Sequence, residues 1–175
     1  FSLFLGPHHI EKVSFVTSKH LNKEVFDVYS LAKFSGPIGI TRGNVFGEEF
    51  DQLIMKNKDV ATKIVEISSN EVRYKMLKKG HILGMFDDNL HAQHILSSEN
   101  SSTSNFEIRF SIDKSPVYFG FSSISVDEEL RRKLNEAWVG LLNQNEIATL
   151  YKNNSVSIDP NELEYFPVKL LETIH

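Results

Sequence analysis

The sequence contains no cysteine. This absence excludes disulfide bonds, thiolate catalysis and zinc sites built from cysteine. No apolar run approaches the roughly 20 residues that a membrane-spanning helix needs. An excess of positive charge is also lacking, since 19 Lys and Arg stand against 23 Asp and Glu, for a net charge of −4. Because phosphate backbones are bound by clustered cations, this balance argues against nucleic acid as a partner.

The remaining composition is that of an ordinary globular protein. The 175 residues are 41% hydrophobic and 24% charged, and this length fits one domain or two small lobes. The chain opens with Phe1 rather than Met, and the apolar residues 1–5 are too short for a signal peptide and lack its basic flank. We therefore expect that an upstream segment has been removed.

A strand, a tight turn and the start of a helix are predicted over residues 38–50, around which we expect the fold to be organised. Ile38 and Ile40 supply the strand, and Gly43 permits a turn conformation that a Cβ atom would resist. Asn44 is expected to cap the helix. Free N–H groups at such a helix start suit a carboxylate or a phosphate. A purely structural turn is the alternative, because a lone glycine turn is a weak motif.

A second strand and helix are predicted next. The β-rich residues 64–67 indicate the strand, and the helix is expected over about residues 71–79, with Gly80 as its C′ residue. The candidate N-caps are Ser68, Ser69 and Asn70. The apolar stripe of this helix is expected to consist of Val72, Met76 and Leu77. Its solvated face and dipole-matched end are expected to carry Arg73, Lys75, Lys78 and Lys79.

A third strand is predicted from the nearly continuous apolar run at residues 82–86, which is typical of a strand covered on both sides. It ends in Asp87 and Asp88, and carboxylates past the carboxyl end of a parallel strand lie where open α/β sheets bind ligands. His91 and His94 follow on a predicted helix. With the aspartates this spacing could hold a metal ion, but we expect a solvated helix face, because nothing else completes a coordination shell.

Two segments before residue 38 give weaker signals. Gly6 and Pro7 form a turn signal, which is expected to close a short extended segment at the start of the chain. Residues 12–17 alternate well enough to predict a strand. Residues 19–33 fit either a short helix or a packed loop.

The last third of the chain is predicted to hold two strands and two helices. In order, the elements are a loop at 97–105, strands at 106–112 and 117–121, a helix from Ser125 or Asp127 to Leu142, a helix at 146–151 and an extension from residue 153. Arg109 is expected to face water or a cleft, because it alternates with the apolar residues of its strand. Trp138 is interpreted as a core anchor.

The order and spacing of these segments resembles the bacterial extracellular solute-binding proteins of family 3. These are type II periplasmic binding proteins, which serve ABC transporters for amino acids and similar polar solutes. The resemblance covers about residues 1–152, and its matching segments are 1–2, 37–43, 68–82, 84–88, 115–122, 127–137 and 147–152. It implies an α/β fold of the periplasmic-binding-protein-like II type, with a doubly wound, mostly parallel sheet.

The resemblance also implies a ligand site. In that family a turn equivalent to residues 43–45 holds the solute α-carboxylate, and an acid at the position of Asp88 receives the α-amino group. The ligand-binding residues expected by this comparison are Thr41, Arg42, Gly43, Asn44, Val45 and Asp88. Asn44 and Val45 depart from the pattern, because many members carry Ser or Thr hydroxyls there.

The resemblance further implies an incomplete first lobe. Residues 1–7 are expected to cross between lobes, 8–105 to form the second lobe, 106–152 to return to the first lobe, and 153–175 to extend from it. The first half of the first lobe should precede Phe1, including an arginine that commonly clamps the ligand carboxylate. We therefore expect a separated N-terminal segment or a swapped copy to complete the protein.

The expected function is that of a periplasmic solute-binding protein of an ABC uptake system. It would bind a small, polar, amino-acid-like solute in an inter-lobe cleft and present the closed form to the membrane subunits of the transporter. No cofactor, metal or nucleic acid is expected. Two alternatives keep the fold: a ligand-sensing module of a membrane receptor, and a hydrolase or lyase. Against an enzyme, no nucleophile and base can be placed together from the sequence.

Overall fold

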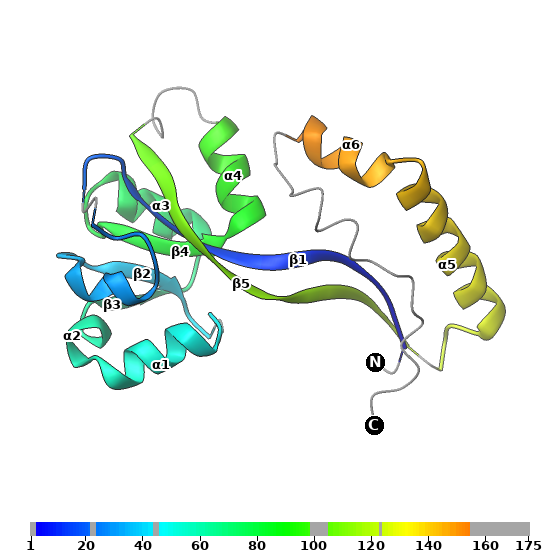
Figure 1. Cartoon of the computed structure of the whole chain (residues 1–175), viewed down its shortest axis with the longest axis horizontal. Helices are drawn as coiled ribbons and strands as arrows, with labels where there is room; N and C mark the ends of the chain where they lie inside the picture. The colour runs from blue at the N-terminus through cyan, green and yellow to red at the C-terminus, as the bar shows by residue number, and fades with distance from the viewer. Residues whose placement is uncertain (1–2, 22–23, 44–45, 99–104, 123, 155–175) are drawn as a thin grey trace. The chain divides into compact units, whose positions relative to one another are not determined.

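The computed structural model describes residues 3–21, 24–43, 46–98, 105–122 and 124–154 (Figure 1). The chain divides into two compact units. Residues Lys12–Lys114 form the first, here called the sheet unit. Residues Phe1–Glu11 and Ser115–His175 form the second, here called the helical unit. Two long strands, β1 (Leu3–Ser18) and β5 (Phe106–Phe121), each contribute residues to both units.

A five-stranded sheet in the order β3-β2-β4-β1-β5 forms the centre of the sheet unit. The short inner strands are β2 (Ile38–Thr41), β3 (Ile64–Ile67) and β4 (Gly84–Asp88). Strand β2 runs parallel to both β3 and β4, whereas β1 runs antiparallel to β4. The predicted α/β fold with a mostly parallel sheet is therefore confirmed.

Helices cover both faces of this sheet, and a separate hydrophobic core lies under each face (Figure 1). On one face, α1 (Glu48–Lys56) and α2 (Lys58–Ala61) contribute to a core that includes Phe50, Phe15 and Phe86. On the other face, α3 (Asn70–Lys78) and α4 (Asn89–Ser98) pack over Val16 and Met85. In β1 and β4, neighbouring side chains alternate between the two cores, as Phe15 and Val16 and then Met85 and Phe86 show.

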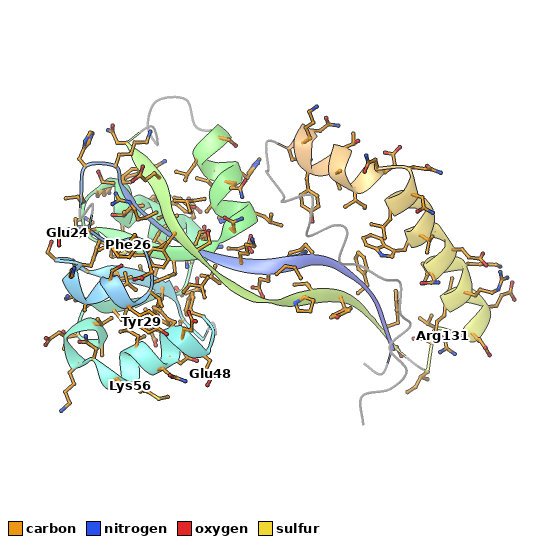
Figure 2. The ribbon with its side chains drawn as sticks, in the orientation of Figure 1. Glu24, Phe26, Tyr29, Glu48, Lys56 and Arg131 are labelled. Carbon is orange, nitrogen blue, oxygen red and sulfur yellow. The ribbon has the colours of Figure 1, made fainter. Side chains whose placement is uncertain are left out.

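The ends of the helices follow local capping rules. The Ser69 side chain, one of the three candidates, accepts a hydrogen bond from the Val72 N–H and caps α3, and Gly80 after the helix has φ 72°. Helix α1 carries acidic residues in its first turn and Lys56 in its last turn, which matches the helix dipole, and Figure 2 labels Glu48 and Lys56 at its two ends.

The predicted start of α1 was wrong. The helix begins at Glu48 with Gly47 as its N-cap rather than directly after Asn44. Gly47 has φ 95°, a conformation that residues with a Cβ atom rarely adopt, so a second glycine separates the turn at Gly43 from the helix. Asn44 itself lies outside the described residues.

Two predicted interruptions of strands are absent. Gly6 and Pro7 lie within β1, and the two strands predicted at 106–112 and 117–121 are one strand, β5. The predictions failed because β1 and β5 are neighbours in the sheet, and pairing over a long distance overrides a local turn signal. Pro116 is tolerated because β5 is an edge strand, where a missing N–H group costs little.

Three further elements complete the fold. Residues 24–28 are irregular, with Val25 and Val28 buried, and they lead into a short 3₁₀ helix, η1 (Tyr29–Lys33). In the helical unit, Asp127 caps α5 (Glu128–Asn143), which is followed by α6 (Glu146–Asn153). Trp138 on α5 is buried and packs edge-on against Phe119, which confirms its role as a core anchor. None of the helices in the described ranges is both long enough and apolar enough to cross a membrane.

Candidate ligand-binding site

One edge of the sheet gathers the ends of three parallel strands and the starts of two helices. Strands β2, β3 and β4 all run in the same direction, so their carboxyl ends lie at the same edge. Helix α3 begins three residues after β3 ends, and α4 begins directly after β4. This edge therefore presents helix N–H groups and the last side chains of the strands together, an arrangement that suits a polar ligand.

The end of β2 places three of the predicted residues at this edge. Thr41 is the last residue of the strand and is partly buried. Arg42 has a side chain that is 70% exposed and forms an ion pair with Glu66, at 3.4 Å between Nε and Oε2. Gly43 has φ 77°, which is the conformation predicted for the turn. Asn44 and Val45 lie outside the described residues.

Asp88 ends β4 at the same edge. Its Oδ1 accepts a hydrogen bond from the His91 backbone N–H at 2.9 Å, so the carboxylate caps the first turn of α4. The side chain is partly buried, and its Oδ2 has no hydrogen-bond partner among the described residues. Asp88 therefore keeps one carboxylate oxygen available for a ligand cation.

Asp87, the neighbouring carboxylate, is in a different state. It is only 4% exposed, and the Nη2 of Arg73 lies 2.6 Å from its Oδ1. The Tyr74 hydroxyl donates to its Oδ2 at 2.9 Å, and the Nδ1 of His91 lies 2.6 Å from the same oxygen. Both oxygens of Asp87 are thus occupied, and we assign it to the structure rather than to a ligand.

Arg73 is a polar residue of this edge that the sequence analysis misplaced. It was predicted on the solvated face of α3, but it is 1% exposed, and its Nη1 donates a hydrogen bond to the Thr41 hydroxyl. Burial lowers the pKa of the Arg73 guanidinium. Electrostatic interaction with Asp87, and to a smaller extent with Tyr74, partly offsets this lowering. The group stays protonated at any physiological pH, because the arginine pKa is so high.

The error came from the choice of helix face. The buried residues of α3 are Arg73, Tyr74 and Leu77, and Val72, which was predicted in the apolar stripe, is 45% exposed. The predicted exposure of Lys75, Lys78 and Lys79 is confirmed. A signal was present in the sequence, because Arg73 lies one turn before Leu77, and a carboxylate on a buried strand requires a partner.

The histidines of α4 do not form a metal centre with other described residues. The side chain of His91 is 36% exposed and is paired with Asp87, and His94 is exposed. Within the ranges that the structure describes, no group of three or more His, Cys, Asp or Glu side chains could hold a metal ion. Arg109, predicted to face water or a cleft, instead donates to the backbone oxygens of Ser18 and Leu21 and pairs with Glu107.

Solved structures with the same arrangement of strands and helices identify the fold. An ancestral arginine-binding protein bound to arginine matches with a TM-score of 0.64 and 16% identity, over 86% of this chain and 62% of the other. The fold is that of the type II periplasmic binding proteins. The second substrate-binding domain of Lactococcus lactis GlnP, in an open conformation, matches with a TM-score of 0.60 and 16% identity, over 90% of this chain and 64% of the other.

A third structure has the same type II periplasmic binding fold. It is the second substrate-binding domain of a putative amino acid ABC transporter from Streptococcus pneumoniae, with a TM-score of 0.59 and 13% identity over 89% of this chain and 66% of the other. This chain therefore spans slightly less than two thirds of the length of these structures. No protein-family model matches the sequence, and a search of curated proteins finds no match.

Proposed function

We propose that the sheet unit forms one lobe of a solute-binding protein and binds a small, amino-acid-like solute at the carboxyl edge of its sheet. The observation that carries the proposal is that Thr41 and Asp88, which end neighbouring parallel strands, lie at the same edge. Proteins that share the fold include arginine-binding and glutamine-bound examples, and this supports an amino acid as the class of solute.

The two strand ends offer opposite chemistry, which suits a zwitterion. The turn after β2 contributes the Thr41 hydroxyl, the Arg42 side chain and the backbone at Gly43, all suited to a carboxylate. The end of β4 contributes the open oxygen of Asp88, which suits an ammonium group through a charge-assisted hydrogen bond. We include Asn44 and Val45 in the proposed site, because they directly follow Gly43 in the sequence.

The wider role is also part of the proposal, and the shared fold supports it. The solute would be enclosed in a cleft between this lobe and a second lobe by hinge closure, and the closed form would be recognised by the membrane subunits of an ABC transporter. Such a protein works outside the cytoplasmic membrane, in the periplasm of a bacterium with two membranes. The role is binding rather than catalysis.

We propose further that additional polypeptide covers the apolar surface of the helical unit, either a separate segment or a swapped copy of this chain. The supporting observation is the exposure of large apolar side chains there, namely Phe119, Ile124, Leu130, Leu141 and Leu150. Native mass spectrometry of the purified chain tests this proposal. A dimer or a complex with a second fragment is expected, and a lone 20.0 kDa species that stays soluble would contradict it.

The binding proposal is tested by a thermal-shift screen followed by calorimetry. The 175-residue chain is screened against L-amino acids, polyamines and small carboxylates, and an L-amino acid is expected to raise the melting temperature. Asp88→Asn is then compared with Asp51→Asn, which changes an exposed carboxylate on α1. Asparagine can still cap α4, so Asp88→Asn removes charge alone and should abolish binding, whereas Asp51→Asn should not change it. Equal affinity in all three proteins would refute the proposed role of Asp88.

A further inference from the structure

We infer that Arg73 determines the specificity of this edge for a carboxylate. It fixes the Thr41 hydroxyl as a hydrogen-bond donor, so that this hydroxyl donates to a carboxylate oxygen of the solute. The inference rests on the proposed function, which places a solute at the same edge. It assigns a role to a buried arginine that makes no contact with the solute itself. Arg73 is therefore a positioning residue, and Thr41 is the residue that touches the solute.

The hydrogen-bond chemistry of arginine carries the first step. The guanidinium of Arg73 has donors and no acceptor, so its Nη1 can only donate to Thr41 Oγ1. A hydroxyl oxygen that accepts this bond keeps its own hydrogen for another acceptor. The Thr41 hydroxyl is thereby oriented as a donor toward another group, because it cannot donate to Arg73.

The remaining hydrogen of Thr41 has only a weak partner in the structure. It donates to Oδ1 of Asn70 at 3.4 Å, which is long for a hydroxyl hydrogen bond, normally 2.5–3.0 Å. Asn70 is exposed, and Thr41 is partly exposed at the end of its strand. A carboxylate oxygen of a solute can replace Asn70 as the acceptor and form a shorter, charge-assisted bond.

The second step concerns the contacts that fix the position of the Arg73 side chain. Its Nη2 is 2.6 Å from Asp87 Oδ1, and both side chains are at most 3% exposed. The register of β2 with β4, in which Ile38 and Gly39 lie beside Gly84 and Met85, places Thr41 level with Asp87 when continued by two residues. One planar guanidinium therefore spans the two strand ends, which the single ammonium of a lysine cannot do with the same geometry.

The test compares each amino acid with the amine that lacks its carboxylate. The probes are L-arginine against agmatine and L-glutamine against 4-aminobutanamide, titrated by calorimetry. Thr41→Val should lower affinity for the amino acid about tenfold or more, equivalent to about 1.4 kcal/mol, and leave the amine unchanged. Thr41→Ser should restore the affinity for the amino acid. Arg73→Lys should lower the affinity for the amino acid but not the affinity for its amine.

Thr17→Val provides the matched control for Thr41→Val. The buried Thr17 hydroxyl donates to the Leu83 backbone oxygen at 2.7 Å, on a strand outside the proposed site. Its loss should lower the melting temperature without changing the affinity for either member of a probe pair. Equal losses for the amino acid and its amine in Thr41→Val, or no loss for either, would overturn the inference while leaving solute binding intact.

A readout without any solute separates the inference from the proposed function. The Arg73 guanidinium ¹⁵N resonances of the unliganded chain should shift and lose solvent protection in Thr41→Val but not in Thr17→Val. Unchanged resonances would overturn the inference even if amino acids bind. If the resonances respond and none of the four probes binds the unaltered chain, the proposed function is overturned, and the assigned role of Arg73 in carboxylate selection is overturned with it.

Discussion

The Nη2 of Arg73 on α3 lies 2.6 Å from Oδ1 of Asp87 on β4, and the side chains are 1% and 3% exposed. This buried ion pair joins a helix to the strand whose next residue, Asp88, is proposed to hold the solute. The two adjacent aspartates therefore serve different purposes. Asp87 is committed to Arg73, Tyr74 and His91, and only Asp88 keeps an oxygen for a ligand.

Asp87→Ala should lower the free energy of unfolding by about 3–5 kcal/mol, because it leaves the charge of Arg73 buried and unpaired. Urea denaturation of the purified chain measures this loss. Glu66→Ala is the control, since it breaks the exposed pair with Arg42, in which both side chains are more than half exposed. That loss should stay below about 1 kcal/mol. Similar losses for the two variants would contradict the assigned burial of Arg73 and Asp87.

Gly84→Ala should destabilise the sheet unit by about 1–3 kcal/mol through overpacking. A Cβ atom at this position would lie 2.8 Å from Cε2 of Phe15 and 2.9 Å from Cζ of Phe34. Gly140→Ala is the control, because Gly140 lies within α5 and a Cβ atom there meets nothing within 4 Å. It should be neutral or stabilising by up to about 1 kcal/mol. Thermal unfolding of both variants shows whether Gly84→Ala lowers the melting temperature while Gly140→Ala leaves it unchanged or raises it.

Gly43→Ala should weaken solute binding, because it places a Cβ atom in the turn where a carboxylate is proposed to approach the backbone. Gly80→Ala is the matched control. The two glycines have φ values of 77° and 72°, and a Cβ atom at either meets nothing within 4 Å. Each variant should therefore lose about 1–2 kcal/mol of stability from backbone strain alone. Calorimetry that shows the same affinity in both variants would argue against a ligand at the turn.

Local rules predicted most of the elements of this fold. Gly80 was predicted as a C′ residue, and the observed caps Ser69 and Asp127 were each among the candidates chosen from the residue types that satisfy free backbone groups at helix ends. These caps depend on residues close together in the sequence. The mostly parallel sheet, by contrast, was implied by the family resemblance, and the parallel pairing of β2 with β3 and β4 agrees with it.

The errors concern features that depend on distant residues. Arg73 is buried because Asp87, fourteen residues later, supplies its counter-charge, and the residues next to Arg73 do not by themselves identify that partner. The turn signal at Gly6 and Pro7 was overridden because β5, about a hundred residues further on, pairs with β1. Long-range pairing of this kind decides between states that local propensity leaves balanced.

The most direct test of the proposed site is a map of backbone amide chemical shifts. The ¹⁵N-labelled chain is titrated with the amino acid that gives the largest thermal shift. The account predicts that the largest changes fall on residues 41–43 at the end of β2 and on residues 88–91 at the end of β4. Changes confined to α1, α2 and η1, with residues 41–43 and 88–91 unaffected, would contradict it.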